Sequence, residues 1–140
     1  MTTIACDGKS MAGDGLAARE TLITVLDAIK VTRLDDGRIV GTAGEKPDTR
    51  KFRAWLQEGG TKPKLKDLAA LVLHPDGRLV YHTDSDIEGT PTGLPNAIGS
   101  GCEIAIGAML AGLSPEKAVE IAATRDVYTG GTITVFRRDE

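Results

Sequence analysis

Three of the four Asp-Gly pairs in the first eighty residues, Asp7-Gly8, Asp36-Gly37 and Asp76-Gly77, each lie between two short apolar runs, and this pattern constrains the fold more than any other feature of the sequence. An Asp-Gly pair readily forms the tight turn between two antiparallel strands. The sequence therefore predicts three β-hairpins. They pair Thr2–Cys6 with Ser10–Gly13, Ile29–Leu34 with Arg38–Thr42, and Leu71–Leu73 with Leu79–Tyr81.

A first helix is expected between the second and third hairpins. Phe52, Trp55 and Leu56 share one face of this helix, which we expect to start with Asp48 as its N-cap and to end at Gly59-Gly60. The polar residues that follow, Thr61–Lys66, predict a link without regular structure.

The last third of the chain changes character. Asp84–Leu94 has the Gly, Pro and Asp content of a surface loop, whereas the small residues of Cys102–Leu113 predict a helix suited to close packing. Ser114-Pro115 predicts the start of another helix, which runs to Ala123 or Thr124. Leu22–Leu26 and Thr132–Phe136 read as additional strands. Together these elements predict one α+β domain over residues 1–140 with two antiparallel sheets and helices outside them.

Composition excludes several classes of function. Apolar residues make up 41% and charged residues 26% of the chain, and the net charge of -3 includes no basic stripe, so neither a nucleic acid nor a membrane surface is an expected partner. Neither a membrane-spanning run nor a signal peptide is evident, which predicts a cytoplasmic protein. Cys6 and Cys102 have no metal-ligand spacing and are expected to be buried thiols, and His74 and His82 are expected to face solvent. No metal or cofactor is expected.

The start of the chain carries a candidate nucleophile. If Met1 is removed, Thr2 holds both a hydroxyl and a free α-amine, so one residue supplies an attacking group and the base that deprotonates it. The alternative is that Thr2 is an ordinary strand residue.

Five short motifs elsewhere carry polar groups that could take part in catalysis. "MAGDG" puts Asp14 between glycines, "AIKVTRL" puts Lys30 among strand residues, and "GTAG" puts Gly44 after a strand, where its N–H can face developing negative charge. "AIGSG" and "RDVYTGG" contribute the hydroxyls and carboxylate of Ser100, Asp126 and Thr129. Each also has an ordinary interpretation: a turn for Asp14 and for Gly44, an edge-strand charge for Lys30, an N-cap for Ser100 and a helix end for the last pair.

Together with "TTI" at the start, these motifs resemble the proteasome β-subunit family, including HslV, within the N-terminal nucleophile (Ntn) hydrolases, peptidase family T1. The resemblance implies a four-layer αββα sandwich of Ntn-hydrolase type and a threonine endopeptidase acting in a self-compartmentalised ring. It assigns Thr2 as nucleophile, Lys30 and Asp14 as the charged pair that tunes it, and Gly44 as the oxyanion donor. Ser100, Asp126 and Thr129 would position the terminal amine.

The resemblance also implies a pocket for the residue before the scissile bond and a set of partners. The pocket residues would be Ala17, Ala28, Thr32, Thr42 and Lys46. The partners would be a peptide or unfolded protein, other copies in a homo-oligomeric ring or double ring, and an ATPase unfoldase cap. The cap is in doubt because only Gly59–Leu68 stands where the family usually has a second helix. A small-molecule amidase or acylase with the same chemistry, or a catalytically silent assembly protein, are the alternatives.

Overall fold

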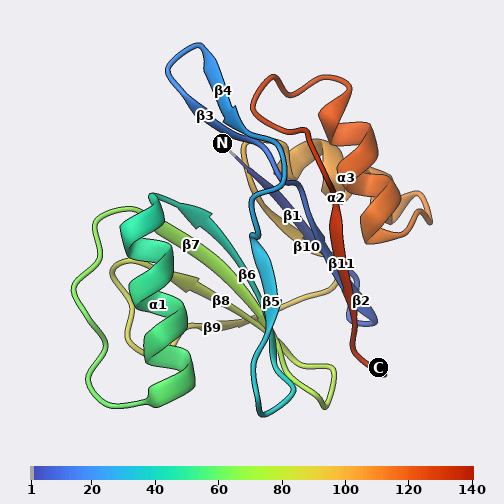
Figure 1. Cartoon of the computed structure of the whole chain (residues 1–140). Helices are drawn as coiled ribbons and strands as arrows, with labels where there is room; N and C mark the ends of the chain where they lie inside the picture. The colour runs from blue at the N-terminus through green and yellow to red at the C-terminus, as the bar shows by residue number, and fades with distance from the viewer. Residues whose placement is uncertain (1) are drawn as a thin grey trace.

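The computed structural model describes residues 2–140 as short strands and three helices (Figure 1). The strands are β1 (Thr3–Cys6), β2 (Ser10–Gly13), β3 (Ala17–Arg19), β4 (Leu22–Val25), β5 (Val31–Arg33), β6 (Ile39–Gly44), β7 (Leu68–Leu73), β8 (Leu79–Thr83), β9 (Thr90–Thr92), β10 (Asn96–Gly99) and β11 (Thr134–Arg137). The helices are α1 (Lys46–Glu58), α2 (Cys102–Leu110) and α3 (Pro115–Ala123). The mixed α and β content agrees with the predicted fold class. Met1, whose removal the sequence suggests, lies outside the described residues.

Antiparallel pairing builds the sheets. One contains four strands in the order β10-β1-β2-β11, and a second contains five in the order β5-β6-β7-β8-β9. The three predicted hairpins are all present as β1–β2, β5–β6 and β7–β8. The structure adds a feature that the sequence did not predict: β3 and β4 form a separate two-stranded hairpin, which projects beside the N-terminus (Figure 1).

The two larger sheets pack face to face. Ile4 and Met11 from the four-stranded sheet meet Ile39 and Leu71 from the five-stranded sheet in one buried cluster. Gly41 of β6 allows this approach, since a Cβ there would lie 2.4 Å from Cγ2 of Ile4. The strand alternation that sends Ile4 inward sends its neighbours to the opposite face of the sheet.

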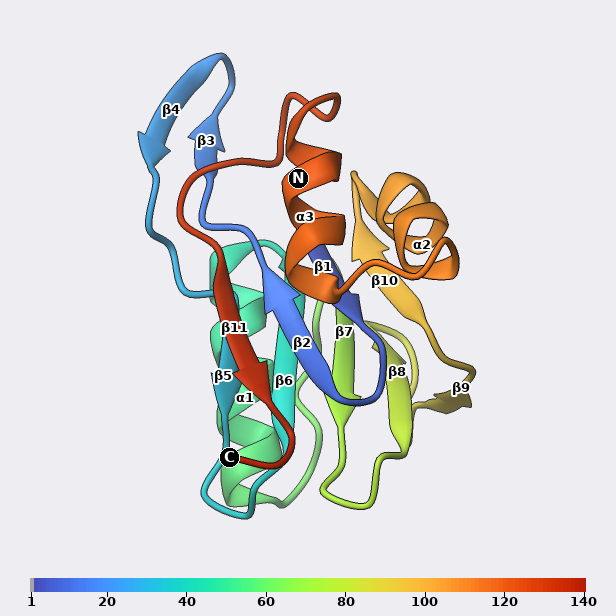
Figure 2. The ribbon, with the colours of Figure 1, turned by 90° about the vertical axis from the view of Figure 1, so that its right-hand side faces the viewer.

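The helices cover the outer faces of the two sheets (Figure 2). Ala5 and Ala12 meet Ala118 and Val119 beneath α2 and α3, where small side chains permit close packing. On the other sheet, Phe52 of α1 is fully buried against strand residues that include Val40, Ala70 and Val72. Truncation of such a buried phenylalanine to alanine typically costs about 3–5 kcal/mol.

Helix α1 does not start as predicted. Its N-cap is Glu45, and Asp48 lies inside the first turn, where it is buried. The Asp48 carboxylate instead accepts hydrogen bonds from the backbone N–H groups of Lys66 and Asp67, at 2.9 and 2.8 Å. These bonds hold the pKa of Asp48 below its usual value. Asp48 therefore ties the start of the helix to the link before β7.

Helix α2 is shorter than predicted and ends at Leu110. Gly112 has φ +100°, and the N–H groups of Gly112 and Leu113 donate to the carbonyls of Met109 and Ala108. This is the Schellman arrangement that closes a helix with a left-handed glycine. Helix α3 begins as predicted, because the Ser114 hydroxyl accepts from Lys117 N–H at 3.2 Å.

Three smaller predictions were wrong. His82 is 5% exposed and packs edge-on against Phe52, so it does not face solvent. Cys102 is only half-buried, although Cys6 is buried as expected. The loop Asp84–Leu94 contains the short strand β9.

None of the helices within residues 2–140 has both the length and the apolar character needed to cross a membrane.

Candidate active site

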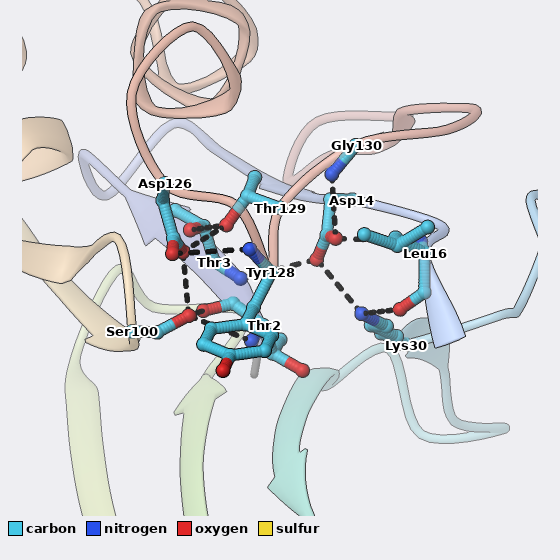
Figure 3. Close-up of polar contacts among 10 residues, drawn as sticks. All are labelled: Thr2, Thr3, Asp14, Leu16, Lys30, Ser100, Asp126, Tyr128, Thr129 and Gly130. Atoms are coloured by element: carbon cyan, nitrogen blue, oxygen red, sulfur yellow. Dashed lines mark hydrogen bonds and ion pairs between the residues drawn. The ribbon is translucent and has the colours of Figure 1, made fainter. Parts of the chain in front are cut away.

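The first two described residues, Thr2 and Thr3, lie between two groups of polar side chains (Figure 3). Thr3 is held from both sides: its N–H donates to Oδ1 of Asp14 at 3.0 Å, and its hydroxyl lies 2.6 Å from the hydroxyl of Thr129. Thr2 and Thr3 are both buried. The start of β1 is therefore fixed in position by partners that lie 11 and 126 residues further along the chain.

The first group centres on the carboxylate of Asp14, which follows β2 and is fully buried. Its Oδ1 atom pairs with Nζ of Lys30 at 3.0 Å, and its Oδ2 atom accepts from the N–H groups of Leu16 and Gly130. Lys30 also donates to the carbonyl of Leu16 at 2.6 Å. A charge this far from water requires such partners, and here both members of the pair have them.

Lys30 lies just before β5 rather than within it. Its carbonyl accepts from the N–H of Thr42 at 3.0 Å, which fixes the lysine backbone against β6. Only 12% of its side chain is exposed, and the ammonium is directed toward the Asp14 carboxylate and the Leu16 carbonyl rather than toward bulk water (Figure 3).

The second group centres on the carboxylate of Asp126. Ser100 and Thr129 both donate to its Oδ2 atom at 2.5 Å, and Tyr128 N–H donates to Oδ1 at 3.2 Å. Burial raises the pKa of this carboxyl, but the hydrogen bonds outweigh burial and leave the pKa of Asp126 below its usual value. The Ser100 hydroxyl lies 3.3 Å from the nitrogen of Thr2. This group therefore links the Asp126 carboxylate to Thr2 through the Ser100 hydroxyl and to Thr3 through the Thr129 hydroxyl.

The structure changes the local setting of these residues. Ser100 is not the N-cap of α2, because Gly101 occupies that position. Asp126 and Thr129 do not end a helix, because α3 stops at Ala123 and both residues lie in the turn that follows. Their separation of three residues still places both side chains together, since Thr129 N–H donates to the Asp126 carbonyl at 3.2 Å.

Gly44 ends β6 with φ +141°, a conformation that side chains rarely adopt. A Cβ at this position would lie 2.2 Å from the carbonyl oxygen of Asp67, so only glycine fits. The backbone therefore requires glycine here for a structural reason, and the oxyanion role of Gly44 stays a prediction.

The residues assigned to the specificity pocket come from four elements. Ala17 starts β3, Thr32 lies in β5, Thr42 lies in β6 and the exposed Lys46 starts α1. The Thr32 hydroxyl is buried without a hydrogen-bond partner in the described part of the chain. Ala28 is fixed beside Gly15, whose carbonyl accepts its N–H at 2.9 Å. The assignment of these residues to a pocket stays a prediction.

Sequence reasoning missed the contribution of Thr3 and of backbone groups of Leu16, Tyr128 and Gly130. The second threonine of "TTI" could have been suspected, because it adds another hydroxyl beside Thr2. The Leu16 carbonyl and the N–H groups of Leu16, Tyr128 and Gly130 carry no side-chain signal and depend on the fold alone. Within residues 2–140, no cluster of three or more His, Cys, Asp or Glu residues could hold a metal ion.

Comparison with known proteins supports the fold. No protein-family model matches the chain, and no curated protein matches its sequence. Among solved structures, eukaryotic HslV from Trypanosoma brucei superposes with a TM-score of 0.72 at 18% identity, covering 96% of this chain and 97% of that one. Thiobacillus denitrificans BPH gives a TM-score of 0.66 at 19% identity, covering 96% of this chain and 95% of that one. BPH in complex with epoxomicin gives 0.68 at 18% identity, covering 96% of both.

The chain therefore has the fold of HslV and of proteasome-like threonine peptidases over nearly its whole length. More particularly, the resemblance to HslV inferred from the sequence motifs is confirmed at the level of the fold.

Proposed function

We propose that this chain is a threonine endopeptidase of the proteasome β-subunit and HslV type, active once Met1 is removed. The observation that carries the proposal is the position of Thr2 and Thr3 between the Asp14–Lys30 pair and the Ser100–Asp126–Thr129 group. The likeness in fold supports it, and one of the similar structures contains epoxomicin.

The first step would be attack by the Thr2 hydroxyl. Removal of Met1 converts the amide nitrogen of Thr2 into an amine, whose pKa of about 7.7–8.0 leaves a useful neutral fraction near pH 7.5. The amine takes the hydroxyl proton while Oγ1 bonds to the substrate carbonyl carbon. The ammonium of Lys30 stabilises the negative charge that develops on Oγ1, and the Gly44 N–H would do the same for the carbonyl oxygen.

The second step would break the C–N bond of the substrate. The protonated amine of Thr2 returns its proton to the leaving nitrogen, which departs as an amine and leaves an ester on Oγ1. Water, deprotonated by the same amine, then hydrolyses the ester and restores the hydroxyl. Ser100, positioned by Asp126, would orient the amine through both steps, because its hydroxyl is 3.3 Å from the Thr2 nitrogen.

Assembly into a homo-oligomeric ring, single or double, forms part of the proposal. The β3–β4 hairpin supports it, because Leu22, Ile23 and Leu26 are each more than half exposed, which is costly for an isolated monomer. We assign a four-layer αββα sandwich over residues 1–140, a cytoplasmic location, and peptide or unfolded-protein substrates. An ATPase unfoldase cap would have to bind without the usual second helix, since residues 59–67 contain neither helix nor strand.

The decisive experiment combines intact mass with turnover of fluorogenic peptides. An active preparation should have lost one methionine, Thr2→Ala should be inactive, and Thr2→Ser should keep part of the activity because hydroxyl and amine both remain. Full activity in a preparation that retains Met1 would refute the use of the amine as base.

Two alternatives are tested by the same preparation. A small-molecule amidase or acylase would cleave simple acyl amides in preference to peptides. A catalytically silent assembly protein would form rings but turn over neither substrate. No observation favours either alternative.

A further inference from the structure

A groove of about 340 Å³ runs along β10. This strand is the outer strand of the four-stranded sheet (Figure 2). All four residues of β10 line it, and Ala69 of β7, Tyr81 of β8 and Cys102 of α2 complete its walls. None of these residues is an Asp, Glu, Lys, Arg or His. The groove therefore combines an unpaired strand with uncharged walls.

The backbone of β10 has donors and acceptors directed into the groove. The Thr3 carbonyl accepts from Asp14 N–H, so Thr3 faces β2, and alternation makes Ile4 face β10. Ile4 pairs with Ile98, so the polar groups of Ala97 and the N–H of Gly99 point away from the sheet, whereas the φ of +96° at Gly99 takes its carbonyl out of the strand pattern. An edge of this kind is a template for another extended chain.

The Asn96 side chain already occupies one of the backbone donors of this strand edge. Its side-chain carbonyl accepts from the N–H of Ala97 at 2.8 Å, and its amide donates to the Thr92 hydroxyl at 2.9 Å. Tyr81 also lines the groove, on the side of the five-stranded sheet. A ligand that displaces one Asn96 contact would gain backbone pairing in exchange.

The groove borders the proposed active site. Gly99 lies next to Ser100, and it approaches Thr2 so closely that a Cβ on Gly99 would be 1.9 Å from the Thr2 carbonyl oxygen. A strand added to β10 would run about 10 Å from β1, which an extended chain spans in about three residues. Lys30 lies on the opposite side of Thr2 from Ser100 (Figure 3).

We propose that the β10 groove binds an extended, uncharged peptide segment by strand addition. Resting on the function proposed above, this segment is the part of the substrate that follows the scissile bond, because the pocket assigned to the preceding residue lies on the Lys30 side. The peptide backbone supplies the pairing with Ala97 and Gly99, and side chains on one face of the segment pack against Ala69 and Tyr81.

Binding is tested without catalysis in Thr2→Ala protein, by the rate at which iodoacetamide alkylates Cys102. Cys6 does not compete, because it is fully buried and burial raises the pKa of its thiol to about 12. Cys102→Ala gives the background. An octapeptide of alternating valine and serine, blocked at both ends, should slow alkylation at least fivefold, and Asn96→Ala should lower the peptide concentration for half protection at least threefold.

Two N-methylated forms of the peptide serve as matched controls. Methyl groups on the alternate nitrogens that face β10 should abolish protection, whereas methyl groups on the other set should leave it intact. Equal protection by both forms, or no protection by the parent peptide, overturns strand addition.

Turnover separates this proposal from the function on which it rests. Substrates with four residues after the scissile bond should show at least tenfold higher kcat/KM than substrates with one. Turnover without any length dependence overturns the groove as a substrate site and leaves the peptidase assignment standing. Protection of Cys102 without any turnover refutes the peptidase assignment and retains the groove as a peptide site.

Discussion

Replacement of Asp14 by asparagine should destabilise the protein far more than its small chemical change suggests. The carboxylate accepts four hydrogen bonds, two on each oxygen, from Lys30 and from the N–H groups of Thr3, Leu16 and Gly130. An amide keeps only one oxygen. Whichever way the asparagine turns, its NH₂ group faces two donors in a buried site.

The size of the effect follows from these contacts. A hydrogen bond to a charged group contributes about 1.5–3 kcal/mol, so losing two of them costs about 4 kcal/mol in the free energy of unfolding. Lys30→Met removes the bonds to Asp14 and the Leu16 carbonyl and should cost about 3 kcal/mol. In the double variant no ammonium is left without its anion, so the combined loss should be about 2 kcal/mol smaller than the two single losses together.

Urea unfolding at pH 7 and one fixed protein concentration measures these values, with Trp55, the single tryptophan, as the fluorescent reporter. Far-UV circular dichroism gives an independent signal. If Asp14→Asn costs less than 1 kcal/mol, or if the two substitutions add within 0.5 kcal/mol, the Asp14–Lys30 pair does not organise the site as described.

Three further outcomes are expected. Gly44→Ala should lower the free energy of unfolding in urea by at least about 3 kcal/mol, because its Cβ would clash with the Asp67 carbonyl. Gly59→Ala, where a Cβ would meet nothing within 4 Å, should lower it by about 1 kcal/mol. Equal losses would contradict the strain argument. Burial lowers the pKa of His82, so the unfolded chain binds a proton more readily and the free energy of unfolding should fall as pH drops below about 6.5. His82→Phe should make the free energy of unfolding less dependent on pH in this range. An unchanged pH dependence would exclude His82 as its source. Ile23→Lys, in strand β4, should dissociate the assembly as measured by light scattering, whereas Ile87→Lys, at an exposed position elsewhere, should leave it intact. If the assembly of Ile23→Lys stays intact, the β3–β4 hairpin is not part of the interface.

Local signals predicted the hairpins well because the turn chemistry and the adjoining strands agree. Asp7-Gly8, Asp36-Gly37 and Asp76-Gly77 mark where the chain reverses, and the apolar runs beside them specify which strands pair, so no distant contact is needed to place β1–β2 or β7–β8. The start of α3 is equally local, because Ser114 caps it through its own hydroxyl.

The sequence predictions were wrong where contacts between distant parts of the chain determine the local structure. Asp48 has the chemistry of an N-cap, but its carboxylate is used by the backbone at Lys66 and Asp67, which only the folded chain brings close. His82 was misplaced although strand alternation puts it on the same face as Val80. The candidate site was proposed from side chains, and the backbone donors and acceptors around them depend on how separate strands and turns meet.

The two contacts that hold Thr3 fix where each residue before it lies in the site. Because Asp14 fixes its N–H and Thr129 fixes its hydroxyl, any residue that ends the chain is placed by its distance from position 3. Trimming after Met1 puts a new amine near the Ser100 hydroxyl. Trimming one residue further puts the amine of Thr3 against the Asp14 carboxylate, with its hydroxyl already bonded to Thr129. The second threonine therefore cannot replace the first, and only one cut yields the proposed nucleophile.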